Sequence, residues 1–250
     1  MLPTCFEQHF SAVDDVNSGL TSLALFNAEW YWKESDEPDH ISLDLLFYDS
    51  KWLINAVNQF CEKELITNRR VAASLVQKRL MSCVVSPLVA VYLFSGVVPQ
   101  LNVKQLFINQ ALSENIQWRG QPFCTTNESL VSWLDDLINQ FFEVFRTLLR
   151  VNPKAFWGNA ALAIASPWSR LASFGKGGEA VQPNIKHFLS TFSPPIKNAL
   201  EWLLVEKTTG YVCVPRRNSC CLKYSLPNRT LCGTCNRRSK EEQITLIQSQ

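Results

Sequence analysis

Four cysteines lie within sixteen residues near the C-terminus, and this arrangement constrains the chain more than any other feature. They form an adjacent pair, Cys220 and Cys221, then ten residues, then the C-x-x-C of Cys232 and Cys235. Cysteines that serve only as small core residues are scattered through apolar segments. The residues around these four are instead largely polar and basic: Arg216, Arg217, Asn218, Lys223, Arg229, Arg237 and Arg238. We therefore expect the thiols to be present for their chemistry.

Four thiols at this spacing suit a tetrahedral zinc ion, an iron–sulfur cluster or two disulfides. Structural zinc sites usually take their ligands from two C-x-x-C-like turns, because a two-residue spacer lets both sulfurs face one ion. Neighbouring residues of an extended chain point in opposite directions, so Cys220 and Cys221 converge only in a turn or on a wider object. A two-iron cluster is wider than one ion. The adjacent pair therefore favours iron–sulfur, while zinc and disulfides remain open.

A longer pattern surrounds the cysteines. It reads Arg216-Arg217-x-x-Cys220-Cys221-x-x-Tyr224-x-Leu226-Pro227, followed by Cys232-Gly233-x-Cys235. This pattern resembles the C-terminal signature of the FhuF-type ferric-siderophore reductases, in which cysteines of this spacing hold a 2Fe-2S cluster. The spacing agrees at every cysteine, and one extra residue separates the arginine pair from the first cysteine. Trp157-Gly158-Asn159 also resembles an internal segment of the family, although we favour a helix-packing role for this segment because its small residue permits close approach of a neighbouring helix.

The resemblance implies a function and a set of site residues. Cys220, Cys221, Cys232 and Cys235 would be the ligands of a 2Fe-2S cluster, and the catalytic residues through it. The protein would reduce a ferric siderophore of the hydroxamate type by one electron and release Fe(II), which hard oxygen donors hold more weakly than Fe(III). A ferredoxin or a reduced flavin system would donate the electron. Gly233 is expected to let the backbone turn between the last two cysteines.

Basic residues near the cysteines have a separate expected role. Positive charge stabilises a reduced, more negative cluster and attracts an anionic siderophore or an acidic ferredoxin. The candidates for this docking role are Arg216, Arg217, Lys223 and Arg229. The alternative is a solvated loop face. The alternative for the whole protein is a zinc-stapled, non-enzymatic interaction module that uses the same four cysteines.

Composition excludes several other classes of protein. The 250 residues are 46% apolar and 18% charged, and the net charge of +2 indicates no nucleic-acid partner. No Gly-x-Gly-x-x-Gly or Walker motif is present, and the three histidines are scattered. The N-terminus lacks a basic stretch followed by an apolar one. We expect a cytoplasmic monomer with no integral membrane span and at most peripheral contact with the cytoplasmic face of the inner membrane.

The apolar pattern predicts a mainly α (α+β) fold in two parts. These are a helical body over 1–205, with a β hairpin at about 101–119, and a cluster-binding segment over 206–250. The uncharged stretch between Arg79 and Gln100 contains Pro87 and Pro99, so we expect a buried helix from Pro87 that is too short to span a bilayer. Cys213 is expected in a strand. The helices are expected at 50–65, 69–80, from Pro87, from Asn127, from Pro153 to Pro167, at 184–191 and at 195–205, with a glycine-rich linker at 174–179.

Overall fold

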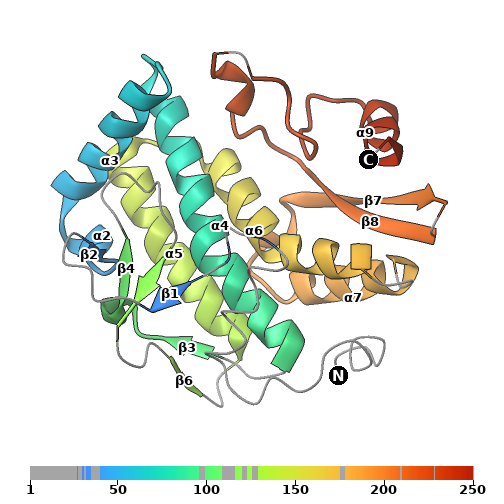
Figure 1. Ribbon diagram of the computed structural model, residues 1–250, viewed down its shortest axis with the longest axis horizontal. Helices are drawn as coiled ribbons and strands as arrows, with labels where there is room; N and C mark the ends of the chain where they lie inside the picture. The colour runs from blue at the N-terminus through green and yellow to red at the C-terminus, as the bar shows by residue number, and fades with distance from the viewer. Residues whose placement is uncertain are drawn as a thin grey trace.

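Three long helices form the core of the computed structural model. The structure describes residues 27, 30, 32–34, 40–95, 99–108, 116–119, 123–125, 129–174, 178–208, 210–227 and 229–249. Helices α4 (Arg69–Ser95), α5 (Leu130–Leu149) and α6 (Pro153–Phe174) lie side by side, with a β hairpin and the cysteine segment beyond α6 (Figure 1). The fold is mainly helical with small sheets, as expected.

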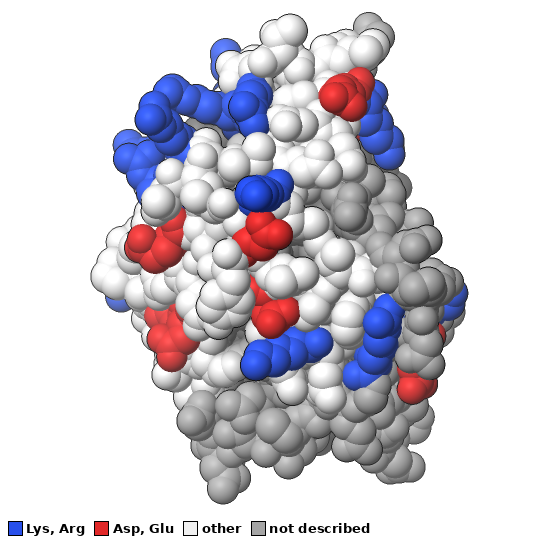
Figure 2. Space-filling view, turned by 90° about the vertical axis from the view of Figure 1, so that its left-hand side faces the viewer, with Lys and Arg blue, Asp and Glu red and all other residues white. Residues whose placement is uncertain are grey.

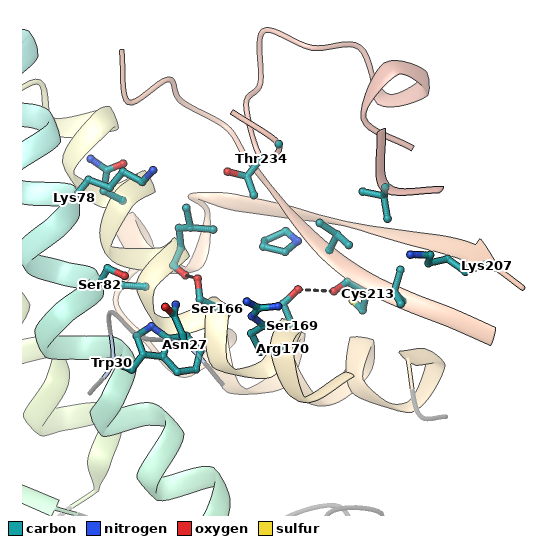
Figure 3. A pocket seen from close by; sticks show the side chains of 18 residues that line it. Asn27, Trp30, Lys78, Ser82, Ser166, Ser169, Arg170, Lys207, Cys213 and Thr234 are labelled. Carbon is teal, nitrogen blue, oxygen red and sulfur yellow. Dashed lines mark hydrogen bonds between the residues drawn. The ribbon is translucent and has the colours of Figure 1, made fainter. Parts of the chain in front are cut away.

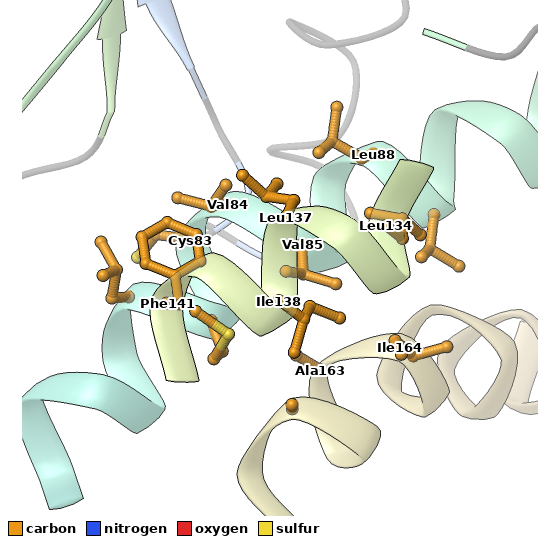
Figure 4. Close-up of a cluster of buried hydrophobic side chains, with 14 of the residues drawn as sticks. Cys83, Val84, Val85, Leu88, Leu134, Leu137, Ile138, Phe141, Ala163 and Ile164 are labelled. Carbon is orange, nitrogen blue, oxygen red and sulfur yellow. The ribbon is translucent and has the colours of Figure 1, made fainter. Parts of the chain in front are cut away.

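The apolar faces of these helices meet in one continuous core. Cys83, Val84, Val85 and Leu88 of α4 pack against α5, and Ala163 and Ile164 of α6 close the other side (Figure 4). The expected apolar stripe of α5 is buried at Leu130, Leu134, Leu137, Ile138, Phe141 and Phe145, whereas Leu148 is exposed. Burial of this area from water is the main force that holds the helical body together.

Helix α4 is one continuous helix, so the expected division into two helices is wrong. Pro87 lies inside it and cannot donate a hydrogen bond to the carbonyl of Cys83, four residues earlier. The indole N–H of Trp32 donates to that carbonyl instead, at 2.8 Å. Residues Arg69–Leu93 are long and apolar enough to cross a membrane, contrary to the length argument, but 83% of the apolar window is buried inside the protein. This burial is typical of a core helix.

Helices at both ends of the body differ slightly from expectation. Helix α2 (Leu45–Tyr48) leads into α3 (Ser50–Lys63), whose N-cap is Asp49, which accepts from the backbone N–H of Lys51 at 2.9 Å. Helix α6 continues past Pro167 to Phe174. Helix α7 (Gly178–Ser190) begins earlier than expected, and residues 175–177 of the glycine-rich linker lie outside the described residues.

The sheet at the far side of α5 is larger than the expected hairpin. Strands β4 (Leu106–Ile108) and β5 (Gln117–Trp118) pair antiparallel as expected, with Leu106 opposite Trp118. Strands β1 (Lys33–Glu34) and β2 (Ile41–Ser42) extend them into the order β1-β5-β4-β2. The remaining elements here are the pair β3 (Pro99–Leu101) and β6 (Phe123–Thr125) and the short helix η3 (Val103–Gln105).

The helix expected at 195–205 is wrong for most of its length. Helix α8 (Pro194–Lys197) is one turn long, and strand β7 (Leu200–Lys207) follows it. Strand β7 pairs antiparallel with β8 (Gly210–Arg217), which contains Cys213 as expected, and the pairing runs from Leu200 opposite Arg217 to Lys207 opposite Gly210. Strand β8 packs on α6 and α7. The domain boundary predicted between residues 205 and 206 falls within β7 and stays a prediction.

Candidate iron–sulfur site

The four cysteines lie on the segment that follows β8, between the helical body and the C-terminal helix α9 (Lys240–Gln248). They form two pairs. The Sγ atoms of Cys220 and Cys235 are 3.9 Å apart. Cys221 and Cys232 share one donor, because Nη2 of Arg217 lies 3.1 Å from the first Sγ and 2.8 Å from the second. Neighbours in sequence thus belong to different pairs.

Local backbone geometry explains how adjacent cysteines serve different pairs. Leu222 adopts a left-handed conformation with φ of 66°, and its N–H donates to Sγ of Cys220 at 3.3 Å. The chain then enters the short helix η4 (Lys223–Ser225). The C-x-x-C closes as a turn, in which the N–H of Cys235 donates to the carbonyl of Cys232 at 3.1 Å. Cys221 itself packs on Val71 and Leu75 of α4.

Arg217 is the centre of a buried polar network that connects the thiols to the helical body. Its side chain is 0% exposed, and its Nη1 donates to Oδ1 of Asn159 at 2.7 Å. Asn159 Nδ2 in turn donates to Oε1 of Gln77 at 2.7 Å and to the carbonyl of Ser74 at 3.2 Å. The Ser74 hydroxyl donates to the carbonyl of Cys221 at 3.4 Å. The network returns to the cysteine segment, so α4 and α6 both position this thiol pair.

The Trp157-Gly158-Asn159 segment combines packing with site geometry. A Cβ on Gly158 would lie 2.3 Å from Oγ of Ser219, so only glycine lets α6 approach the start of the cysteine segment. The Ser219 hydroxyl fixes this approach by donating to the carbonyl of Lys154 at 2.6 Å. The interpretation as a packing segment is therefore right for Gly158. The role of Asn159 was missed, and the only signal for it was the family resemblance.

The structure places the four candidate docking residues in different environments. Arg217 is buried against the thiols, and Arg216 forms an ion pair with Glu201 at 2.5 Å while also donating to the carbonyls of Asn236 and Arg238. Arg229 is exposed, and Lys223 is partly exposed. Only these last two remain available for docking. Tyr224 contacts a guanidinium, with Arg237 4.3 Å from the centre of its ring.

Gly233 does not have the role that was expected for it in the turn between Cys232 and Cys235. It is not among the described glycines with positive φ, and a Cβ at this position would meet only Leu246 Cδ2, at 3.9 Å. The turn therefore does not require glycine. The residue instead lies exposed at the edge of a cavity.

Electrostatics distinguish the members of the Cys221–Cys232 pair. A hydrogen bond from Cys232, with the charges of Arg217 and Lys78, lowers the pKa of Cys221 to about 4. The same hydrogen bond raises the pKa of Cys232. Burial lowers the pKa of Lys78, although both thiols oppose this shift. At neutral pH the pair therefore carries one negative charge beside two basic groups.

The remaining buried thiol has the opposite character. Burial raises the pKa of Cys213 to about 12, so this thiol stays protonated. Its carbonyl accepts from the Ser169 hydroxyl at 2.9 Å, in the middle of β8. Cys213 is therefore the strand residue that the sequence indicated.

Two cavities flank the cysteine segment. The first, of about 490 Å³, lies between α4, α6 and the β7–β8 hairpin and reaches Gly233 and Thr234 (Figure 3). The second, of about 790 Å³, lies between the start of α4, the end of α5 and the start of α6, and reaches Leu222. Each cavity touches a residue next to a cysteine.

The donor set and its arrangement in two pairs are compatible with a two-iron cluster. Among the residues that the structure describes, no three Cys, His, Asp or Glu side chains are grouped to hold a single metal ion. A structural zinc needs four ligands around one point, whereas a 2Fe-2S cluster held by four thiolates places two on each iron. The two thiol pairs match the second requirement.

A family model matches the cysteine segment. A search of curated proteins finds no match to this chain. The family model described as the FhuF 2Fe-2S C-terminal domain matches residues 217–236, which begin at Arg217 and include all four cysteines. The cysteine segment is therefore similar to the FhuF 2Fe-2S C-terminal domain, in agreement with the resemblance seen in the sequence.

Proposed function

We propose that this protein is a ferric-siderophore reductase that acts in the cytoplasm on complexes of the hydroxamate type. The observation that carries the proposal is the arrangement of four thiols as two pairs around a buried arginine. The match of residues 217–236, which contain the same cysteines, to a 2Fe-2S domain also supports it. A one-electron reductase needs a one-electron centre close to its surface, and Cys220 and Cys232 are both partly exposed.

The residues of the chain have defined tasks in this function. Cys220 and Cys235 would hold one iron, and Cys221 and Cys232 the other. When bound, a 2Fe-2S cluster exchanges one electron at a time, which is what reduction of Fe(III) to Fe(II) requires. Arg217 donates to two of the sulfurs, and hydrogen bonds and positive charge at sulfur favour the more negative, reduced state. Reduction then releases the metal, because hard oxygen donors hold Fe(II) weakly.

The electron donor in this proposal is an acidic ferredoxin, with a reduced flavin system as the alternative. The cavity beside Leu222 is lined by Arg70, Arg146 and Arg150. These three side chains have no acidic partner among the described residues. Basic side chains also gather at the upper end of the face in Figure 2. A cationic surface next to the thiols steers an anionic donor protein by long-range attraction.

An anaerobic preparation tests the proposal directly. We expect a brown protein with about two irons per chain, as a 2Fe-2S cluster requires, and with trapped Fe(II) appearing when reduced ferredoxin and a ferric trihydroxamate are added. Cys220→Ser and Cys235→Ser should each abolish Fe(II) release and leave the helical circular dichroism unchanged. Full release by either variant would contradict the proposal. A colourless protein with one zinc per chain would establish the interaction module instead.

A further inference from the structure

The cavity of about 490 Å³ has one wall on the cysteine segment itself. Its lining includes Gly233 and Thr234, the two residues between Cys232 and Cys235. The hydroxyl of Thr234 lies 3.9 Å from Sγ of Cys232, and the Thr234 carbonyl accepts from the N–H of Arg217 at 3.1 Å. A molecule in this cavity therefore contacts the turn that carries two of the four thiols.

The other walls of the cavity are basic. Lys78 of α4 lines the end of the cavity near the cysteine segment, and Arg170 of α6 and Lys207 of β7 line the cavity farther from that segment (Figure 3). None of the described residues that line the cavity is acidic. The positive charges of Lys78 and Lys207 favour an anion that enters this hollow.

Lys78 has an ammonium group that interacts with the charge of the Cys221–Cys232 pair but donates no hydrogen bond to a described residue. It has no hydrogen bond or ion pair with any residue that the structure describes, although it is only partly exposed. A partly desolvated ammonium without acceptors is costly. An oxygen-rich ligand in the cavity would supply those acceptors, and Thr234 and the half-buried Ser166 add hydroxyl groups to the same walls.

We propose that this cavity binds the ferric complex and selects complexes with a net negative charge, such as a trihydroxamate that bears a free carboxylate. The inference rests on the proposed function for the redox step. One electron passes from the cysteine-held centre to Fe(III), which becomes Fe(II), and no covalent bond to the protein forms or breaks. A one-electron donor of the ferredoxin class restores the electron.

A charge series of one siderophore tests this selection without any redox chemistry. The gallium(III) complexes of desferrioxamine B, its N-acetyl derivative and its N-succinyl derivative share one metal-binding chain and are cationic, neutral and anionic, respectively. Titration calorimetry should show affinity rising in that order, by about tenfold or more between the extremes. Added salt should reduce the difference, since these charges are partly exposed.

Variants of the cavity locate the binding site. Arg170→Gln and Lys207→Gln should each weaken binding of the anionic complex by about threefold to tenfold and leave the cationic complex unchanged or tighter. Ser166→Phe should block all three complexes, with thermal unfolding as a check that the protein is folded. Lys51→Gln, an exposed lysine on α3, is the charge-matched control and should change nothing. Lys78 is left out of this set because it also acts on the cysteine thiols.

The outcomes separate this inference from the proposed function. Equal affinities for the three complexes, or Arg170→Gln and Lys207→Gln variants that bind the anionic complex as the wild type does, would overturn the charge selection. If the brown protein reduces ferric complexes yet binds no gallium complex, the cavity assignment fails and the reductase function stands. If binding follows charge in a protein that holds no iron, the cavity assignment stands and the reductase function fails.

Discussion

The two faces of the β7–β8 hairpin place neighbouring arginines in opposite environments. Arg217 points toward α6, is fully buried and donates to thiols and to Asn159. Arg216 points toward α9, where its partly exposed side chain pairs with Glu201, which also contacts Lys240 at 2.9 Å. Successive residues of a strand alternate between faces, so the two arginines lie on opposite faces although they are neighbours in sequence.

The difference shows which charges the site depends on. An exposed ion pair contributes about 0 to 1 kcal/mol, because water already solvates both groups. Removal of one partner from a buried pair costs about 3 to 5 kcal/mol, because the other charge is left unpaired away from water. The body-facing side of the hairpin should therefore determine cluster properties and contribute more to stability than the α9-facing side does.

Replacement of Arg217 should have the largest effect of all. Arg217→Met leaves the Cys221 thiolate and Oδ1 of Asn159 without their donor, so we expect the metal-free protein to lose about 3 kcal/mol or more of unfolding free energy in urea. Any cluster that forms should have a lower reduction potential, because the hydrogen bonds to sulfur are lost. Arg216→Met is the matched control; it removes a partly exposed ion pair and two hydrogen bonds to carbonyls, so it should cost about 1 to 2 kcal/mol, less than Arg217→Met. Equal losses in the two variants would remove the distinction between the faces.

Asn159 should have the next largest effect, since it connects Arg217 to α4. Asn159→Ala leaves a buried guanidinium N–H and the Gln77 side chain without their partners, at an expected cost of about 1 to 3 kcal/mol. The effect should be smaller in the Arg217→Met background, because the hydrogen bond to the guanidinium is already lost there, whereas the part that comes from Gln77 and the Ser74 carbonyl should remain. Additive losses in the double variant would show that Asn159 stabilises α6 by some other contact.

Two glycines next to the site give a comparison of packing. Gly158→Ala places a methyl group 2.3 Å from Oγ of Ser219, so the Ser219 side chain must move and give up its hydrogen bond to the Lys154 carbonyl, at a cost of about 1 to 3 kcal/mol. Gly233→Ala meets only Leu246, at 3.9 Å, and should change stability by less than about 0.5 kcal/mol. Urea unfolding of both variants measures the difference. A larger loss for Gly233→Ala would mean that the turn does require glycine.

Sequence reasoning found the features that depend on nearby residues. The apolar spacing of α5 and the thiol spacing are both visible within short windows, and the structure bears out the first. Helix α4 was divided at Pro87 because the compensating donor, Trp32, is 51 residues away from Cys83. Strand β7 was assigned as helix because its pairing with β8 gives the 200–207 segment its conformation, and local spacing does not show this pairing.

The same limit applies to the site: contacts between residues far apart in sequence could not be predicted. Charge placed Arg216 and Arg217 in one group, since neither the burial of Arg217 nor the ion pair of Arg216 can be seen from the residues next to them in the sequence. Asn159 lies 58 residues from Arg217 in sequence, and Lys78 lies on α4, far from the cysteines in sequence. The thiols could be predicted from the sequence, whereas the groups that support them depend on how α4 and α6 pack.

The smallest effect is expected on the α9-facing side and depends on pH. Hydrogen bonds from Lys240 and Arg216 lower the pKa of Glu201 below its ordinary value of 4.5. A lowered carboxyl pKa stabilises the folded state above the unfolded pKa, and this contribution is lost as the pH falls through the folded pKa.

Glu201→Gln should therefore cost less than about 1 kcal/mol at neutral pH and nothing in acid, where the wild-type carboxyl is also neutral. Urea unfolding at neutral and acidic pH checks this, with Glu206→Gln on the same strand as the control. A loss that persists in acid would mean that Glu201 acts through packing, and the α9-facing side would then share the body-facing side's dependence on specific contacts.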